Sequence, residues 1–465
     1  MAFSKIFLFG AAFILSVCAA PTGLKKGVAP ETGDFTPEPY VQLTHPEWTR
    51  DAVLYQINTR QYSEEGTFAE VQKDLPRLKE LGVDILWFMP IHPIGEKNRK
   101  GTLGSYYSVK DYYGVNPEFG TKADFKALVE EAHDQGFHVI LDWVANHTAW
   151  DHPLTIEHPD WYEKDWKGDF RPTPWWDWSD IIDLDFSKPG VRKHMSDAMT
   201  YWVEEVGVDG FRADVAGYVP LDFWEGVRRR LESIKPVFML GEWETRDLHA
   251  KAFDATYWWE WKEAMQSIAK GKADTGALYS VYSANESAWP IDAFRMTYTS
   301  NHDQNSWDGT PLEIFGDAYE TAIALQFTGE GFPLIYNGQE GANDHRLEFF
   351  EKDKITWNFD SALNTLFKNL IQFKTDNPAL HNGAWGARTT KVENSNAQKV
   401  FSFIRQKEGN AVLGVFNLSD ETQIMSFTDE LPVGEYKEFK TGATVSIGEE
   451  TILTLAPWEY RLYSR

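Results

Sequence analysis

A repeating unit of a short apolar run, a loop and an amphipathic helix begins near Asp51 and constrains this chain more than any other feature. In the first copy, residues 68–81 carry apolar side chains at helical spacing and end before Gly82. The apolar runs that can form strands are 53–57, 83–88, 137–141, 207–213, 237–240, 252–257, 294–298 and 333–336. Strands that alternate with helices over about 300 residues predict an α/β fold whose parallel sheet closes into a (β/α)8 barrel.

The character of the sequence changes after about residue 378. Residues 399–404 and 411–416 are short runs with the alternating pattern typical of antiparallel strands. We therefore predict a barrel over 51–377 and a C-terminal antiparallel β-sandwich domain over 378–465. A chain of 465 residues is too long for one small core and suits this division. A short loop domain, residues 148–185, is expected as an insertion after the third strand.

The first residues have the composition of an export signal. Lys5 precedes an apolar run over residues 6–17, which is too short to span a bilayer but suits a signal peptide, predicted at 1–19. Residues 15–18 resemble a bacterial lipoprotein signal, in which Cys18 is lipidated. Ordinary cleavage after Ala19 is the alternative. Residues 20–50, which are rich in proline, are expected to form an N-terminal arm.

This signal predicts an exported protein that is periplasmic, attached to the cell surface as a lipoprotein, or secreted. A membrane partner is expected only through the lipid anchor. Cys18 is the only cysteine of the chain, which excludes internal disulfides, thiolate metal sites and a catalytic thiol in the mature domain.

Charge and aromatic content restrict the partners further. With 45 basic and 70 acidic side chains, the net charge of −25 repels phosphate backbones, so no nucleic-acid partner is expected. Aromatic residues make up 15% of the chain. They indicate either a large core or ring platforms on which the apolar faces of sugars stack.

Several carboxylates stand at positions where a barrel carries its chemistry. The acidic residues directly after, or slightly beyond, a predicted strand are Asp142, Asp214, Glu242, Asp303 and Glu340. Converging carboxylates shift one another's pKa, so one can act as an acid while another stays ionised. Arg212 lies two residues before Asp214, so both side chains point to the same side of the strand. An acid beside an ionised nucleophile is the arrangement of a retaining glycosidase.

The motifs around these carboxylates resemble those of glycoside hydrolase family 13, the α-amylase family, in order and spacing. The matching segments are 142–147 (DWVANH), 210–214 (GFRAD), 240–243 (LGEW), 299–303 (TSNHD) and 331–340 (GFPLIYNGQE). The resemblance covers about residues 51–465 and implies a TIM barrel. It implies that Asp214 is the nucleophile, Glu242 the acid/base, and Asp303 a third carboxylate that binds sugar hydroxyls and stabilises the transition state.

The resemblance also implies a set of residues around the cleaved sugar. Tyr107 matches the ring that stacks on that sugar, and Arg212, His147 and His302 match the family's partners around it. The full expected substrate-binding set is Tyr107, Asp142, His147, Arg212 and His302.

The calcium site of the family is only partly matched. Asn146 and Asp183 match two of its ligands, and Tyr218 could add a backbone carbonyl. Calcium takes six to eight oxygen ligands, so two side-chain oxygens would supply only a small part of its ligand set. Calcium is the one cofactor considered, and no organic cofactor is expected. Many α-amylases carry Lys-His where this chain has Gly217-Tyr218, so binding on the product side is expected to differ.

The expected loop domain is dense in aromatic residues: Trp150, Trp161, Tyr162, Trp166, Trp175, Trp176 and Trp178. About half of them are expected to form a small core of the loop, and the other half a stacking wall beside the cleft.

Together these features predict a monomeric, exported hydrolase that cleaves α-1,4-glucosidic bonds of starch-like α-glucans or maltooligosaccharides with retention. Exo-action, or transfer of the glucosyl unit to another sugar, stays open because the loops at the cleft ends decide it. A non-catalytic α-glucan-binding protein and a structural or adhesion protein are alternatives from other classes. The complete set of three carboxylates argues against both.

Overall fold

The computed structural model describes residues 37–428 and 433–465, of which Tyr40–Arg465 form one compact unit. The predicted signal peptide, Cys18 and the first part of the predicted arm lie outside the described residues. Within the described part of the chain, no helix is both long and apolar enough to cross a membrane.

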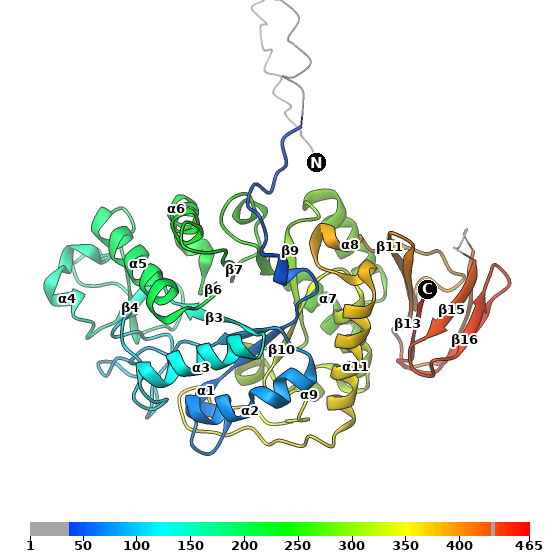
Figure 1. The fold of residues 1–465 in the computed structure, drawn as a ribbon, viewed down its shortest axis with the longest axis horizontal. Helices are drawn as coiled ribbons and strands as arrows, with labels where there is room; N and C mark the ends of the chain where they lie inside the picture. Colours follow the sequence, from blue (N-terminus) through cyan, green and yellow to red (C-terminus); the bar gives the residue numbers. More distant parts are fainter. Residues whose placement is uncertain (1–36, 429–432) are drawn as a thin grey trace, which may run out of the picture. The chain divides into compact units, whose positions relative to one another are not determined.

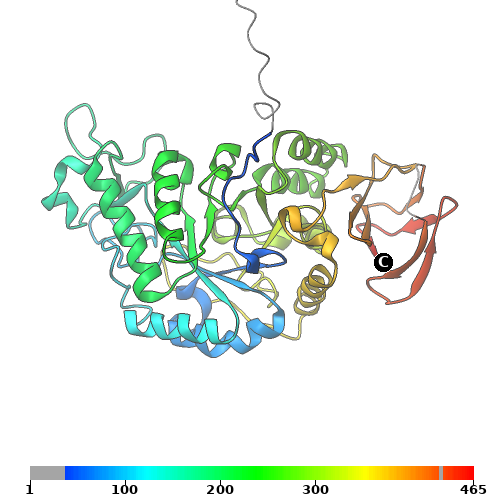
Figure 2. The ribbon, with the colours of Figure 1, turned by 45° about the horizontal axis from the view of Figure 1, so that its top comes forward.

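Eight parallel strands close into the predicted barrel, in the order β1-β10-β9-β8-β7-β6-β3-β2 (Figure 1, Figure 2). Each strand overlaps one of the predicted apolar runs. The strands are β1 (Leu54–Ile57), β2 (Ile85–Phe88), β3 (His138–Trp143), β6 (Gly210–Ala213), β7 (Phe238–Gly241), β8 (Ala255–Tyr257), β9 (Phe294–Tyr298) and β10 (Phe332–Tyr336). The first and last strands close the ring, with Leu54 opposite Leu334.

Helices surround the strands (Figure 1). The longer ones are α2 (Phe68–Leu81), α3 (Lys122–Asp134), α5 (Pro189–Tyr201), α6 (Leu221–Glu232), α7 (Trp259–Ala269), α8 (Gly276–Ala288), α10 (Tyr319–Thr328) and α11 (Ala362–Asp376). Short helices are α1 (Thr59–Tyr62), α4 (Leu154–Glu157) and α9 (Pro311–Phe315). Helix α2 has the predicted bounds because its apolar face is buried and Gly82 ends it with φ 97°, a conformation that glycine adopts without strain.

The inside of the barrel is a packed core. Buried side chains from several strands meet there, among them Trp87, Phe238, Tyr257, Met296 and Leu334. A second, larger cluster fills the space between the strands and the helices. Because much of the interior is filled with apolar side chains, polar groups are expected to converge at the C-terminal ends of the strands.

The described end of the predicted N-terminal arm packs on the barrel. Trp48 stacks on His138 at the start of β3, with ring centroids 3.8 Å apart. The ring of His45 stacks on Phe294 at the start of β9, and its Nδ1 lies 2.7 Å from Asp254 Oδ1. This segment therefore covers the N-terminal ends of the strands, which leaves the C-terminal ends open for chemistry.

A small antiparallel insert follows β3, as predicted. Strands β4 (His147–Ala149) and β5 (Ile181–Asp183) pair with His147 opposite Asp183. The segment between them carries helix α4 and the exposed tryptophans of the insert.

The C-terminal domain consists of antiparallel strands, as predicted. One sheet has the order β11-β12-β13-β18-β15-β16 and a second pairs β14 with β17. The strands are β11 (Thr390–Lys391), β12 (Val400–Lys407), β13 (Asn410–Asn417), β14 (Gln423–Ser426), β15 (Gly434–Glu438), β16 (Thr444–Ile447), β17 (Ile452–Leu455) and β18 (Tyr460–Ser464). Both sheets contribute to one hydrophobic cluster, for example through Leu413 and Leu455.

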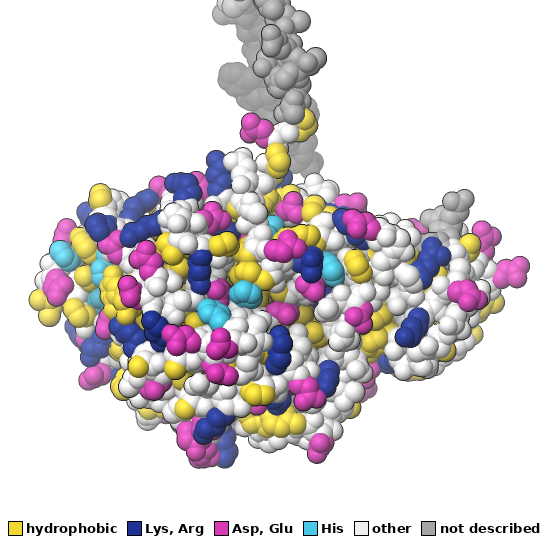
Figure 3. Space-filling view, in the orientation of Figure 1, with side chains coloured by type: hydrophobic (Ala, Val, Ile, Leu, Met, Phe, Trp, Pro, Cys, Tyr) yellow, Lys and Arg dark blue, Asp and Glu magenta, His cyan; other side chains and the backbone are white. Residues whose placement is uncertain are grey.

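The charge of the surface is mixed. On the face drawn in Figure 3, acidic and basic side chains are interspersed rather than gathered by sign. That face offers no continuous basic track for a phosphate backbone.

Candidate active site

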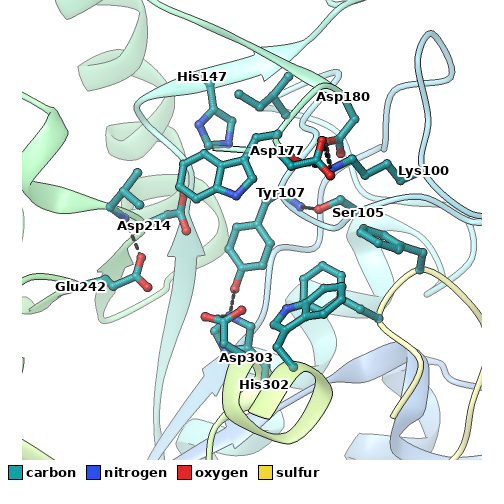
Figure 4. A pocket seen from close by; sticks show the side chains of 16 residues that line it. Lys100, Ser105, Tyr107, His147, Asp177, Asp180, Asp214, Glu242, His302 and Asp303 are labelled. Atoms are coloured by element: carbon teal, nitrogen blue, oxygen red, sulfur yellow. Dashed lines mark hydrogen bonds and ion pairs between the residues drawn. The ribbon is translucent and has the colours of Figure 1, made fainter. Parts of the chain in front are cut away.

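Four of the acidic residues singled out in the sequence converge at the C-terminal ends of the barrel strands. Asp142 lies in β3, Asp214 directly follows β6 and Glu242 directly follows β7. Asp214, Glu242 and Asp303 line a pocket of about 430 Å³ (Figure 4). Asp142 is fully buried and does not line it. This volume lies within the roughly 300–1,000 Å³ typical of small-molecule sites.

Arg212 holds three of these carboxylates together. Its Nη1 donates to Asp214 Oδ1 at 3.0 Å and to Asp142 Oδ1 at 2.8 Å. Its Nη2 lies 2.9 Å from Glu242 Oε2. The guanidinium is fully buried, so these ion pairs are poorly screened by water and fix the carboxylates in place.

One positive charge does not neutralise three carboxylates, of which Asp142 and Asp214 are buried and Glu242 is partly buried. Burial, opposed by Arg212, raises the pKa of Asp142 to about 6. Burial, and then the neighbouring Glu242 carboxylate, raise the pKa of Asp214 well above its usual range, although Arg212 opposes this. Desolvation therefore favours a protonated carboxyl in this cluster, and Arg212 opposes it.

The backbone after Asp214 positions Glu242. Val215 has φ 38°, a left-handed conformation that is rare for a β-branched residue. Its N–H donates to Glu242 Oε2 at 2.8 Å, while the second carboxyl oxygen of Glu242 points toward the pocket (Figure 4). Strained backbone of this kind is often retained at functional sites.

A hydrogen-bonded chain fixes the predicted stacking ring, Tyr107. Gln56 Oε1 accepts from His302 N–H at 3.3 Å, so the amide nitrogen of Gln56 donates to His302 Nδ1, 2.7 Å away. The proton of the neutral imidazole is therefore on Nε2, which lies 2.7 Å from Tyr107 Oη. The Tyr107 hydroxyl in turn donates to Asp142 Oδ2 at 3.0 Å.

Burial keeps the imidazoles of the site neutral. It lowers the pKa of His302 to about 3 and that of His147 to about 4. Both histidines line the pocket, as does Tyr107. These three are the predicted substrate-binding residues that line the pocket. The other two, Asp142 and Arg212, are fully buried and do not line it.

Several residues of the site were not predicted from the sequence. Gln56 lies in β1, and the indole of Trp87 donates to Asp142 Oδ2 at 3.1 Å. The ring of Phe349 lies nearly parallel to that of Tyr107, 6.2 Å away. Other lining residues that sequence patterns did not indicate are Lys100, Trp307 and Phe350. Gln56 and Trp87 occupy strand positions that look like core, and the others lie in loops without periodicity.

Glu340, the fifth acidic residue, does not reach the pocket. It is fully buried, its Oε1 lies 3.0 Å from Arg77 Nη1, and the Tyr55 hydroxyl donates to it. Burial raises the pKa of this carboxyl, and Arg77 opposes the shift. Glu340 therefore connects β10 to helix α2 and has a structural role.

The aromatic residues of the insert divide broadly as expected. Tyr162 is buried, and Trp150 and Trp161 pack partly against the main core. Trp178 lines the pocket and stacks on Trp176, with ring centroids 5.5 Å apart. Trp175 is 99% exposed and Trp166 is also exposed, so these two belong to neither group.

The predicted calcium ligands are only partly brought together. Asn146 Nδ2 donates to Asp183 Oδ1 at 3.1 Å, and the Thr173 hydroxyl donates to the same oxygen at 2.5 Å. The predicted Tyr218 ligand is its backbone carbonyl; the hydroxyl of the same residue accepts from Trp176 Nε1 at 2.8 Å. Within residues 37–428 and 433–465, no group of three or more His, Cys, Asp or Glu side chains is arranged to hold a metal ion. One carboxylate already satisfied by two donors is a poor fit for calcium, which stays a prediction.

Comparison with known proteins agrees with this geometry. Residues 49–391 match the family model described as "Alpha amylase, catalytic domain". The chain is 30% identical over 414 residues to alpha-amylase MalA of Haloarcula japonica, which covers 84% of this chain; the chain spans 60% of the length of that relative.

Solved structures share the fold over nearly their whole length. An alpha-amylase from Lactobacillus plantarum has a TM-score of 0.80 and 31% identity, covering 90% of this chain and 99% of that one. The noncanonic maltogenic alpha-amylase AmyB from Thermotoga neapolitana has a TM-score of 0.81 and 30% identity, covering 89% and 98%. With the matched domain, the barrel and the carboxylates at its strand ends, this chain belongs to the α-amylase family of glycoside hydrolases.

Proposed function

We propose that this protein hydrolyses α-1,4-glucosidic bonds of starch-like α-glucans or maltooligosaccharides with retention of configuration. The observation that carries the proposal is the buried Arg212, which binds Asp214 and Glu242 with its two terminal nitrogens at the wall of one pocket. The names of the relatives, an alpha-amylase and a maltogenic alpha-amylase, support α-glucans as the substrate class.

In the first step, an Asp214 carboxylate oxygen attacks the anomeric carbon. The bond from that carbon to the glycosidic oxygen breaks, and the leaving oxygen takes the proton from Glu242. In the second step, Glu242 takes a proton from water, whose oxygen attacks the same carbon and releases Asp214. Two inversions return the α-anomer.

The other residues of the pocket hold the sugar during both steps. Tyr107 offers a flat ring for stacking, fixed by its bonds to His302 and Asp142. Asp303 lies half-exposed beside His302, whose Nε2 is 3.3 Å from Asp303 Oδ2. We assign Asp303 to the sugar hydroxyls, where a carboxylate also stabilises positive charge that develops in the transition state.

We also propose that the protein is exported and anchored by lipid at Cys18. The support is the apolar run before Cys18 and the proline-rich segment after it, which would let the barrel reach polymer outside the cell. Cys18→Ala should then move the enzyme to the soluble fraction or block its processing without changing the activity of the folded domain.

The catalytic assignment is tested by Asp214→Asn and Glu242→Gln, with the exposed Asp360→Asn as a matched control. Each of the first two should lower kcat on soluble starch by several orders of magnitude, since such groups contribute roughly 4–8 kcal/mol to barrier lowering. The melting temperature should stay within a few degrees, and the control should keep wild-type activity. A variant that retains a tenth of the turnover would show that its residue has another role.

A further inference from the structure

One side of the pocket is lined by residues of the loop between β2 and α3. The Lys100 ammonium of this loop donates to the backbone carbonyl of Asp177 in the insert. It also lies 3.7 Å from Asp177 Oδ1 and 3.8 Å from Asp180 Oδ1. The side chain of Asp180 is almost fully buried. The Lys100–Asp180 ion pair therefore joins the two loops.

The same loop is joined to the loop after β10. Leu103 N–H donates to the Phe350 carbonyl at 3.1 Å, and Thr102 N–H donates to Glu351 Oε1 at 2.9 Å. Gly101, between Lys100 and Thr102, has φ 64°, and a Cβ at this position would lie 2.5 Å from Phe350 Cβ. The two loops therefore touch too closely for a side chain between them.

These contacts join three loops at one side of the pocket, which we call the end wall: residues 100–103, 177–180 and 350–351. Lys100, Asp177, Asp180 and Phe350 line the pocket itself. The wall is built from hydrogen bonds and an ion pair between segments far apart in sequence, so its position is fixed by the fold rather than by one flexible loop.

The end wall lies opposite the proton donor. In Figure 4, Glu242 lies on one side of Tyr107, and Lys100, Asp177 and Asp180 lie on the other. Glu242 protonates the leaving group, so the part of the substrate that departs extends past Glu242. The part that is held by Asp214 and Tyr107 extends toward the end wall.

We propose that the end wall makes this enzyme act from the non-reducing end of an α-glucan and release short saccharides. This inference rests on the proposed hydrolysis of α-glucans. A chain end carries a free 4-hydroxyl, which can accept from Lys100 and donate to Asp177 or Asp180. An internal unit carries another sugar on that oxygen, and this sugar would meet the end wall.

The test compares two maltoheptaosides labelled at the reducing end, one unmodified and one whose terminal 4- and 6-hydroxyls are capped by an ethylidene group. Turnover of the unmodified substrate should exceed that of the capped one by at least about tenfold, the order of discrimination a closed pocket provides. The labelled fragments should show cuts near the non-reducing end. Equal turnover of both, with internal cuts, would overturn the proposal while leaving α-glucan hydrolysis intact. Hydrolysis of neither would contradict the proposed function itself.

Variants locate the effect in the end wall. Lys100→Ala should raise turnover of the capped substrate at least about fivefold relative to the unmodified one and lengthen the released products. Lys97→Ala is the matched control, because Lys97 belongs to the same loop but contacts the ring of Trp150 and does not line the pocket. Lys100→Met, which keeps most of the side-chain length without its charge, should shift the ratio in the same direction and covers the case of a misfolded alanine variant. An unchanged ratio in a folded Lys100 variant would refute the role of the wall.

Discussion

Arg212 Nη1 lies 3.0 Å from Asp214 Oδ1, and only one residue separates the two in the sequence. Side chains two residues apart on an extended strand point to the same side. Arg212 in β6 and Asp214 directly after it can therefore form this ion pair. Strand β6 therefore supplies the guanidinium that fixes the carboxylate of Asp214.

Arg212→Lys keeps the charge but cannot reach Asp214 and Glu242 at once with a forked pair of donors. We expect kcat to fall by about a hundredfold or more, because both carboxylates lose their fixed positions. Steady-state kinetics on maltooligosaccharides, with circular dichroism to confirm folding, measures this. Near wild-type kcat in the folded variant would mean that the guanidinium is not what aligns the pair.

Gln56 is expected to act as a positioning residue for His302. Gln56→Leu removes both hydrogen bonds to this histidine and should lower kcat/KM by roughly tenfold through misplacement of Tyr107. Gln56→Glu can still accept from the His302 N–H but cannot donate to Nδ1, so it should raise the pKa of His302 from about 3.

NMR titration of His302 in Gln56→Glu distinguishes positioning from simple packing. A raised pKa with reduced activity supports the hydrogen-bonded chain described here. Full activity in Gln56→Leu would show that Tyr107 is held without it.

Stability should depend on pH through Asp84, whose Oδ2 accepts from Val53 N–H at 3.0 Å. Burial raises the pKa of Asp84 to about 7, against about 3.9 in an unfolded chain. Between these values the folded state binds more protons than the unfolded state, so stability falls as pH rises.

Asp84→Asn keeps an oxygen acceptor for Val53 and removes the ionisation. Relative to wild type, the variant should be more stable by about 1 kcal/mol or more at pH 8, with little difference at pH 4. Urea unfolding at both pH values measures the two free energies. A difference that is the same at both would contradict a raised pKa.

Calcium binding at Asn146 and Asp183 makes a separate prediction. If the ion binds only the folded state, excess chelator should lower the melting temperature, and added calcium should restore it. An unchanged melting curve, together with metal analysis below about a tenth of an equivalent, would remove the site. Asn146→Ala should abolish any calcium-dependent shift that is seen.

The sequence was sufficient to predict the barrel and its carboxylates, for a physical reason. Each strand is a short apolar run, and Asp214 and Glu242 directly follow such runs, where a barrel must place its polar groups. Helix α2 was predicted to the residue because periodicity and a terminal glycine agree.

Other parts of the site depend on contacts that no local pattern shows. Gln56 is a polar residue inside an apolar strand, and only the fold shows that it faces His302. Lys100 meets Asp177 across 77 positions of sequence. Glu340 has the same local pattern as the catalytic acids, yet its neighbour Arg77 holds it in the core.

The central claim, that Asp214 attacks the sugar while Glu242 supplies the proton, is tested most directly by the anomer first released. Proton NMR of the earliest products from a maltooligosaccharide, recorded before mutarotation, should show the α-anomer, since two successive inversions retain the configuration. Early β-anomer would mean that Asp214 and Glu242 flank a water molecule and act by a single displacement, which would contradict this account.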